Sequence, residues 1–338
     1  MPNKSPAKDV DGHKKTYILT FDLSSKLKLL RTVGLKVPDA KDAIFTEIKN
    51  DLTSMVKSCF TDVSVIAVNM EDLSEEILSR AMEHGSSLKD AMVVSTCLEI
   101  SSLKRGQAIE INRLIDRSGK IIGLGPRPGH GPLESQIQSI AAICRDRSVI
   151  LMEDGTFTGG TLLQILGMFK EHRINVAAVV LGFAFEAALK NLDRQFNGDV
   201  FVVEKLGKFI DWMPDHDFFP FVPNCGRVIG IPWNGCSLPF YTHNGASYSV
   251  PYILPFCPMT KWTSIPEDKA LSFSKYCLER DLEIFRELER LNGRRLIIGD
   301  LMNIYPRVSI PITVGQKHLP HLDASITEFL SDLCHEVS

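Results

Sequence analysis

The sequence predicts an α/β fold of the Rossmann-like kind, with a mainly parallel sheet flanked by helices. Two observations carry this prediction. Short segments of strand composition alternate along the chain with longer segments of helical spacing, which is typical of parallel sheets covered by helices. In addition, the apolar run at residues 149–152 is too short for a helix and is bounded by turn residues, as expected for a buried strand.

The elements before that central strand follow from composition and spacing. Residues 40–60 and 73–84 carry apolar side chains at helical spacing, and each is expected to form a helix. The expected strands are 16–21, 63–68, 91–100, 108–115 and 120–124. The last two strands flank Arg117-Ser118-Gly119, which has the composition of a hairpin turn. A helix at 133–144 then leads into the central strand.

The elements after the central strand begin with a helix from Leu162 to His172. Further strands are expected at 175–181, 200–204 and 227–231, and further helices at 184–196, 267–291 and 324–333. Two intervening segments, 211–220 and 233–263, are rich in aromatic residues and proline, and we expect them to be ordered but irregular.

This order of elements suggests four divisions of the chain. They are a flexible tail at 1–15, an N-terminal α/β segment at 16–89, a core at 90–232 and an irregular, aromatic-rich and helical region at 233–338. The first division is polar and contains proline and glycine, whereas the last holds too many large apolar residues for a linker.

Composition narrows the function. The 338 residues are 44% hydrophobic, enough for a sizeable core, and the formal net charge of -3 gives no general attraction to nucleic acid or to anionic membranes. No apolar stretch reaches the roughly 20 residues that a membrane-spanning helix needs, and no secretory signal is recognisable. The eight cysteines are scattered without a Cys-x-x-Cys pair, so we expect reduced thiols and a cytoplasmic location.

The chemistry is concentrated where the central strand ends. Glu153 and Asp154 follow the apolar run, and a Gly/Thr-rich turn then leads into the helix. Free backbone N–H groups and the positive end of a helix make such a turn a suitable anion site. Two carboxylates beside a phosphate need another partner, which predicts sugar hydroxyls, Mg²⁺ or both.

This stretch resembles the signature of the type I phosphoribosyltransferases: an apolar strand, two acids, a short spacer and Thr-Gly-Gly-Thr. The resemblance implies that Glu153 and Asp154 hold the ribose hydroxyls of phosphoribosyl pyrophosphate and act in catalysis, with Asp154 also near Mg²⁺. It implies a phosphate loop made of Gly155, Thr156, Phe157, Thr158, Gly159, Gly160 and Thr161. On an alternating strand Glu153 faces away from Asp154 unless the turn has begun, so Asp154 is the stronger candidate.

The resemblance also implies a second loop for the pyrophosphate group. Arg127 and Gly129 lie in a rigid, basic, Gly-rich loop between a strand and a helix, and a right-handed crossover would bring that loop beside the central motif. The alternative interpretation is a proline-stiffened surface turn. Arg105 lies in a second candidate loop, but a solvated surface charge is the favoured explanation for it.

Phe157 departs from the pattern of the family. Purine-salvage members commonly carry an acid at this position, where it meets the purine base. Phe157 cannot accept a proton, which makes ordinary hypoxanthine or guanine salvage less favourable and an unusual acceptor more so. Alternatively, Phe157 packs beneath the loop without any bearing on the acceptor.

The family forms a hood over the acceptor from chain outside the core sheet, and the resemblance therefore implies an enlarged C-terminal hood or cap. In the segment 211–220, Trp212 could stack on a flat acceptor. Asp215, His216 and Asp217 could accept hydrogen bonds or a proton. Simple packing of the aromatic residue and a structural or surface role for the histidine are the alternatives.

These features favour a phosphoribosyltransferase of nucleotide metabolism that uses Mg²⁺. Its donor would be phosphoribosyl pyrophosphate, and its acceptor a nucleobase or a less usual group such as a sugar hydroxyl. One alternative is a regulator that binds phosphoribosyl pyrophosphate or a nucleotide without turnover, and another is a structural protein with a vestigial loop. Dimers are common in the resembled family, so a homodimer is an expectation of the resemblance.

Overall fold

The computed structural model describes residues 8–9, 15–85, 91–96, 107–116, 118, 120–127, 130–145, 147–229, 242–243, 246–304, 310–311 and 320–337. The chain forms two compact units, each built from three separate stretches. The first comprises residues 1–17, 62–111 and 131–210, and the second comprises residues 18–61, 112–130 and 211–338. A three-stranded sheet contains β2 (Lys15–Phe21) between β11 (Lys208–Pro214) and β3 (Val63–Asn69).

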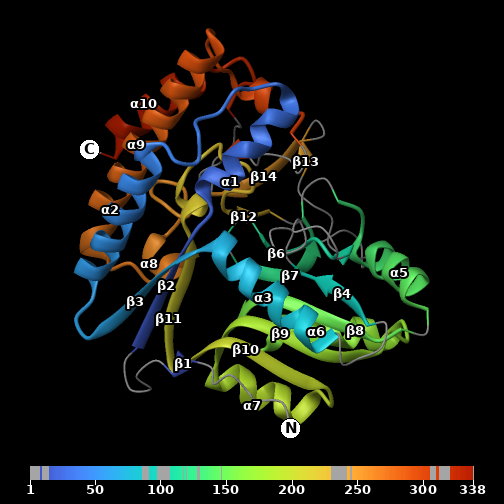
Figure 1. Ribbon diagram of the computed structural model, residues 1–338. Coiled ribbons are helices and arrows are strands. Elements are labelled where there is room, and N and C mark those ends of the chain that lie inside the picture. The colour runs from blue at the N-terminus through green and yellow to red at the C-terminus, as the bar shows by residue number, and fades with distance from the viewer. Residues whose placement is uncertain are drawn as a thin grey trace. The chain divides into compact units, whose positions relative to one another are not determined.

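The first unit contains a six-stranded sheet with the order β1-β10-β9-β8-β4-β5 (Figure 1). All five neighbouring pairs in it are parallel. Its strands are β1 (Lys8–Asp9), β4 (Met92–Ser95), β5 (Gln107–Ala108), β8 (Val149–Thr156), β9 (Val176–Phe185) and β10 (Asp199–Leu206). A parallel sheet is stable only when both of its faces are covered, which explains the continuous apolar runs in β8 and β9.

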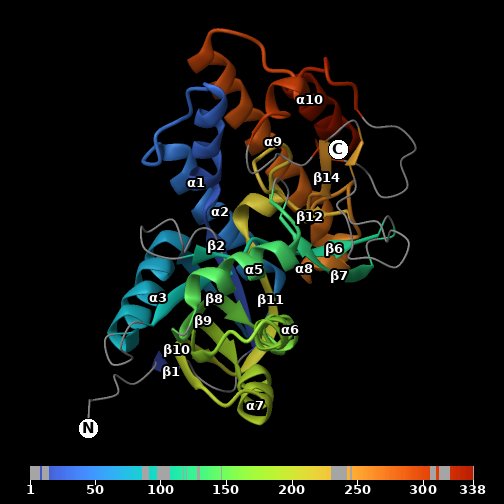
Figure 2. The ribbon, with the colours of Figure 1, turned by 90° about the vertical axis from the view of Figure 1, so that its right-hand side faces the viewer.

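Helices cover both faces of this sheet. They are α3 (Met70–Gly85), α5 (Leu133–Cys144), α6 (Gly160–Glu171) and α7 (Glu186–Gln195). Figure 2 shows α3 on one side of β8 and β9, and α6 and α7 on the other. Because β8, β9 and β10 follow one another both along the chain and across the sheet, right-handed crossovers place α6 and α7 on the same face.

The second unit is mainly helical. Its longest element, α9 (Glu267–Asn292), buries one face and packs against α10 (Ile326–Glu336). The other helices are α1 (Leu23–Lys28), η1 (Leu29–Val33), α2 (Ala43–Cys59), η2 (Asp215–Phe218), α8 (Met259–Thr263) and η3 (Ile298–Leu301). The strands are β6 (Ile111–Ile115), β7 (Ile121–Pro126), β12 (Arg227–Val228), β13 (Thr242–His243), β14 (Ala246–Val250) and β15 (Ile310–Pro311).

The predicted mixed α/β fold with a parallel sheet flanked by helices is confirmed. The helix expected at 133–144 has the bounds of α5, and β6 and β7 form the expected two-stranded pair. No helix among the described residues is long and apolar enough to cross a membrane. The four divisions of the sequence and the C-terminal hood stay predictions, and residues 230–241 lie outside the described part of the chain.

Three expectations about individual elements were wrong. The central strand continues to Thr156, and the next strand continues to Phe185, so that the following helix begins at Glu186 rather than Ala184. The segment expected to be irregular at 211–220 instead contains the end of β11 and the short helix η2. Pairing between β8 and β9 extends both strands beyond the points at which the local sequence alone would end them.

Candidate functional site

The central motif lies at the carboxyl end of β8. Pairing with β9 runs through Gly155, opposite Phe183, and Thr156, opposite Ala184, so the strand includes both acids and the first two residues of the predicted loop. The turn itself is therefore only 157–159, and α6 begins at Gly160. The predicted order of strand, acids, turn and helix is correct, but the turn is shorter than the sequence suggests.

Glu153 and Asp154 lie on opposite faces of the sheet, because side chains alternate along a regular strand. Gly182 is beside Asp154 in the register of β8 and β9. A side chain at Gly182 would meet Leu73 and Ile77 of α3, so Asp154 belongs to the face that α3 covers. Both acids are half-buried. The strand therefore does not present the two carboxylates as a pair on one face, which agrees with the stronger weight given to Asp154.

The turn after β8 is held in a defined conformation. Gly159 has a φ of 84°, in the left-handed region that glycine adopts without strain, and it occupies the N-cap position of α6. The Oγ1 atom of Thr158 accepts a hydrogen bond of 3.4 Å from the backbone N–H of Gly160. The carbonyl of Thr158 accepts a hydrogen bond of 2.8 Å from the side-chain amide of Asn191 in α7.

This geometry suits an anion. Thr158 and Gly160 are exposed, whereas Thr156 is buried and Thr161 half-buried. The first residues of an α-helix have N–H groups without an intrahelical acceptor, and the helix dipole favours negative charge there. The carbonyl oxygen of Thr158 carries partial negative charge, and the hydrogen bond that Asn191 donates partly neutralises it. The hydroxyl proton of Thr158 and the N–H groups that follow Gly160 in the first turn of α6 are the donors that could meet a phosphate group.

Phe157 packs in a cluster of aromatic side chains of the first unit. Its ring stacks on Phe209 at a centroid distance of 4.1 Å and lies 5.7 Å from Phe185. Phe185 and Phe209 themselves meet edge to face at 4.7 Å. This packing supports the simpler of the two interpretations of Phe157, in which the ring anchors the turn, and it leaves the nature of the acceptor open.

Of the residues predicted to bind pyrophosphate, the structure describes only Arg127. Arg127 follows β7 in the second unit, is half-buried, and its carbonyl accepts a hydrogen bond of 3.1 Å from the N–H of His130. Burial and the neighbouring charge of Arg127 lower the pKa of His130. Gly129 and Arg105 lie outside the described residues. The pyrophosphate loop therefore stays a prediction.

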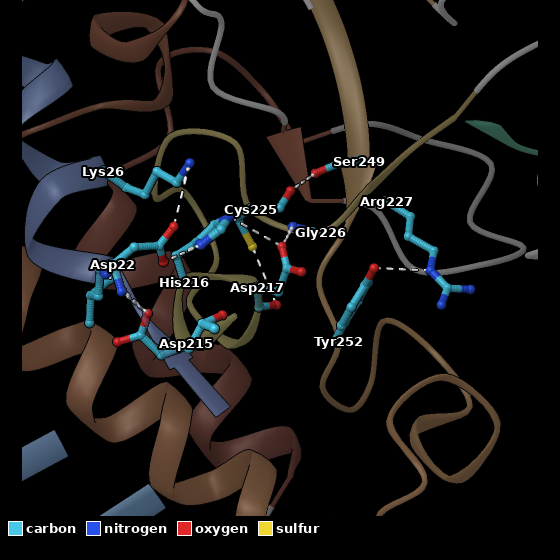
Figure 3. A network of polar contacts seen from close by, with 12 residues as sticks. Asp22, Lys26, Asp215, His216, Asp217, Cys225, Gly226, Arg227, Ser249 and Tyr252 are labelled. Atoms are coloured by element: carbon cyan, nitrogen blue, oxygen red, sulfur yellow. Dashed lines mark hydrogen bonds and ion pairs between the residues drawn. The ribbon is translucent and has the colours of Figure 1, made fainter. Parts of the chain in front are cut away.

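The residues predicted to meet the acceptor form part of a buried polar network in the second unit (Figure 3). Asp215, His216 and Asp217 make up most of η2, and all three are buried. His216 Nδ1 lies 2.6 Å from Asp22 Oδ1, and its Nε2 lies 3.5 Å from Asp217 Oδ1. Asp22 in turn pairs with the ammonium group of Lys26 at 3.5 Å. Burial of this kind favours a structural role over contact with an acceptor.

The charges in this network shift each other's protonation. Burial, together with the neighbouring carboxylate of Asp22, raises the pKa of Asp215 well above its usual value. Burial also opposes ionisation of Asp22, but the charges of His216 and Lys26 outweigh it and lower the pKa of Asp22 below its usual range. Burial raises the pKa of Asp217, although His216 partly offsets that effect. Ionised Asp22 is thus the counterion around which the network is arranged.

Trp212 is also held by protein contacts. Its indole N–H donates a hydrogen bond of 3.0 Å to the hydroxyl of Thr20. The neighbouring Asp211 accepts a hydrogen bond of 2.7 Å from Ser264. Trp212 is half-buried, so the stacking role predicted for it is not tested by its position.

Sequence reasoning missed several residues that shape these two places. Asn191 and Phe209 support the turn after β8, and Asp22 and Lys26 complete the buried network. Two of these residues carry a signal that could have been used: Asp22 is an acid placed directly after a predicted strand, and Lys26 follows it at the i,i+4 spacing of a helical ion pair. Asn191 and Phe209 lie on ordinary helix and strand positions and meet their partners only through the fold.

Comparison with known proteins adds little to this picture. No protein-family model and no curated protein matches the chain. Among solved structures it is similar to UMP synthase from Leishmania donovani, with 13% identity and a TM-score of 0.26 over 40% of this chain and 27% of that chain. It is also similar to adenine phosphoribosyltransferase from Rhodothermus marinus, with 11% identity and a TM-score of 0.26 over 40% of this chain and 77% of that chain. The chain thus matches only about a quarter of the UMP synthase chain.

Proposed function

We propose that the chain binds phosphoribosyl pyrophosphate at the carboxyl end of β8 and transfers its 5-phosphoribosyl group to an acceptor. The observation that carries this proposal is the local geometry of residues 153–161. Two half-buried acids, a tight turn with a left-handed glycine and the N-terminus of α6 follow one another there. They stand in the order of the type I phosphoribosyltransferase motif that the sequence resembles.

The 5-phosphate would lie against the turn. Gly159 and Gly160 have no side chains to block a close approach of the phosphate to the backbone. The hydroxyl groups of Thr158 and Thr161 would donate hydrogen bonds, and the first N–H groups of α6 would add charge-assisted ones. Because Asn191 and the aromatic cluster hold the turn from within the first unit, it needs little reorganisation on binding.

Asp154 would hold the ribose and, with it, Mg²⁺. Carboxylate oxygens are the ligands that Mg²⁺ prefers, and the half-buried acids Asp154 and Glu153 therefore fit this ion in their chemistry. When bound, Mg²⁺ would neutralise the charge of the leaving pyrophosphate. Glu153, on the opposite face of the strand, would act as a secondary acid near the same sugar.

In the transfer itself the bond from C1 of the ribose to pyrophosphate breaks, and a bond from the acceptor to C1 forms. Positive charge develops on the ribose ring, and the carboxylate of Asp154 would oppose it. The acceptor loses its proton in the product. The acceptor remains a nucleobase or a sugar hydroxyl. Asp215, His216 and Asp217 are committed to the buried network, so no general base is assigned among them.

Calorimetric titration of phosphoribosyl pyrophosphate with Mg²⁺ tests the donor site. We expect micromolar binding to the wild type and at least about a tenfold loss for Asp154→Asn, since one charge-assisted contact is worth about 1.5–3 kcal/mol. Asp193→Asn is the matched control, because Asp193 is an exposed acid of α7 in the same unit. The absence of binding to a wild type shown to be folded would overturn the proposal.

Release of pyrophosphate in the presence of candidate acceptors tests the transfer. Nucleobases and compounds with free sugar hydroxyls should be offered separately, with the Asp154→Asn variant as the blank. Release with one acceptor class and not the other identifies the nucleophile. Tight binding of phosphoribosyl pyrophosphate without release by any acceptor would instead favour a regulator that senses this compound.

A further inference from the structure

The buried network of the second unit gathers donor atoms from two distant parts of the chain. Asp22 directly follows β2, and Asp215 and His216 directly follow β11, the neighbouring strand. One ligand atom from each of these three residues lies within 4.8 Å of the other two. All three residues are buried, so the cluster is shielded from the screening that solvent gives to surface acids.

If all three carboxylates of this cluster are ionised, their negative charge exceeds the positive charge that Lys26 and a protonated His216 supply. Asp22, Asp215 and Asp217 are three buried carboxylates, and Lys26 and His216 are the cationic partners that contact them. Burying a charge without compensation is costly. A divalent cation together with a neutral imidazole and the Lys26 ammonium group would balance the three carboxylates completely.

The side chains of the cluster are oriented by hydrogen bonds and ion pairs of the kind that orient the ligands of a metal ion. In metal sites a ligating histidine commonly donates its other ring N–H to a carboxylate. His216 has this arrangement: Nδ1 faces Asp22, while Nε2 lies 3.5 Å from Asp217 Oδ1. Asp217 Oδ1 is itself fixed by a hydrogen bond of 2.7 Å from the N–H of Gly226, as Figure 3 shows.

Asp215 is oriented in the same way. Its Oδ1 accepts hydrogen bonds from the N–H groups of Asp22 and Leu23 at 2.9 and 3.0 Å, which fixes the carboxyl group at the start of α1. Lys26 contacts Oδ2 of Asp22 at 3.5 Å, so its charge is directed at the oxygen that does not face His216. These contacts hold one ligand atom each of Asp22, His216 and Asp215 within 4.8 Å of the other two.

We propose that Asp22, Asp215 and His216 bind a divalent first-row transition ion, either Zn²⁺ or Mn²⁺. Two carboxylates with one imidazole suit these ions, whereas Mg²⁺ prefers oxygen ligands alone. The ion lies among the three ligand atoms in place of the direct contact of 2.6 Å between His216 Nδ1 and Asp22 Oδ1. The bound ion joins the start of α1 to η2 and stabilises the second unit. The site is separate from the Mg²⁺ proposed near Asp154.

Metal analysis of the full chain tests this site. The protein is purified without chelator, equilibrated with Zn²⁺ or Mn²⁺ in an excess of Mg²⁺, and freed of unbound metal. We expect about one equivalent of Zn²⁺ or Mn²⁺ in the wild type, and little in Asp215→Asn or His216→Gln, since loss of a ligand weakens such sites strongly. Asp281→Asn is the matched control, because Asp281 is a buried acid of the same unit outside the cluster, and it should retain the metal.

A chelator should lower the Tm of the wild type and of Asp281→Asn but not that of the two ligand variants. A wild type that takes up neither ion, and whose Tm changes with neither metal nor chelator, overturns the proposal and leaves a shared proton in the cluster. Metal that persists in both ligand variants overturns it as well, because the ion then lies elsewhere.

Two measurements on the wild type guard against variants that fail to fold. Addition of Zn²⁺ to the chelator-treated protein should raise its Tm. Substitution by Co²⁺ should give d–d absorption bands without a thiolate charge-transfer band, because the site has nitrogen and oxygen ligands. A thiolate band, or no Co²⁺ spectrum at all, contradicts the proposed ligands.

Discussion

The side-chain amide of Asn191 donates a hydrogen bond of 2.8 Å to the backbone carbonyl of Thr158, which links α7 to the turn after β8. The Asn191→Ala substitution removes this contact. Because a typical hydrogen bond contributes about 0.5–1.5 kcal/mol, we expect phosphoribosyl pyrophosphate to bind about two- to tenfold more weakly. Calorimetry on the folded variant measures the change. Gln195→Ala, at an exposed position of the same helix, should bind as the wild type does; equal weakening of both variants would contradict a role for the contact.

Gly182 in β9 leaves no room for a side chain. A Cβ atom there would collide with the backbone oxygen of Asp154 and would lie 3.0 Å from Ile77 Cδ1 and 3.1 Å from Leu73 Cδ1. Gly182→Ala should therefore lower the free energy of unfolding by about 1–3 kcal/mol, the usual cost of overpacking a core. It should also weaken donor binding, because β8 has to shift at Asp154.

Denaturant unfolding measures the loss, and Gly167→Ala provides the control. Gly167 is exposed in α6, and a Cβ atom there would have nothing within 4 Å. Alanine at this helical position should raise stability by up to about 1 kcal/mol. If both variants change stability in the same direction, close packing at Gly182 is not the cause.

The part of the site that the sequence predicts is local. An apolar run, two acids, glycines and an amphipathic helix are neighbours in the chain, so the order strand, turn and helix at 149–171 follows from periodicity and turn chemistry. The end of the strand does not follow in this way. Gly155 has the composition of a turn, yet it lies opposite Phe183 in a parallel ladder, and that pairing depends on residues far along the chain.

The buried network is a second feature that the sequence predicts only in part. Asp215, His216 and Asp217 are recognisable as chemically active residues, and the sequence places them in an irregular segment beside a predicted acceptor. Their partner Asp22 lies 193 residues away from Asp215, and the two meet only because β2 and β11 are neighbours in one sheet. Strand order is a property of the whole fold, so a single sequence does not reveal this cluster.

Asp281 is a buried acid whose carboxyl group has no hydrogen-bond partner among the described residues. It lies in α9, is completely buried, and within the described part of the chain its carboxylate oxygens make no hydrogen bond. Burial raises its pKa well above the usual value. Nearby are the thiols of Cys225, Cys277 and Cys334, whose pKa values burial raises. A thiol is neutral or anionic, so none of them supplies positive charge.

The buried carboxyl group of Asp281 makes the free energy of unfolding depend on pH. Because the folded-state pKa lies above the unfolded-state value, the folded chain holds the proton more tightly, and stability falls as the pH rises above about 4. The asparagine of the Asp281→Asn variant does not titrate, so this loss of stability with pH is absent from the variant. Its free energy of unfolding should exceed that of the wild type by an amount that grows from about pH 5 to pH 8, reaching about 1–3 kcal/mol. Urea unfolding at both pH values measures this difference, and a difference independent of pH would contradict the ionisation of Asp281.

His172, in the first unit, gives a second prediction in which stability falls as the pH rises. Its Nδ1 atom lies 2.9 Å from the carbonyl of Met168, and its Nε2 atom lies 2.8 Å from Glu134 Oε1 at the start of α5. The carbonyl of Met168 and the carboxylate of Glu134 both raise the pKa of His172, because only the protonated ring donates to both. The contact therefore stabilises the fold below the unfolded-state pKa of about 6.5, and this stability is lost as the pH rises through the raised folded-state pKa.

Glu134→Gln removes the charge that holds this proton. We expect the wild type to lose more thermal stability than the variant between about pH 6 and pH 8, the range in which histidine titrates. Differential scanning calorimetry at both pH values measures the two losses. Glu186→Gln is the control, because Glu186 pairs with Lys190 and not with a histidine. The effect is small, since Glu134 is exposed, but its sign is fixed: a variant that loses as much stability as the wild type would show that the His172–Glu134 contact does not form in solution.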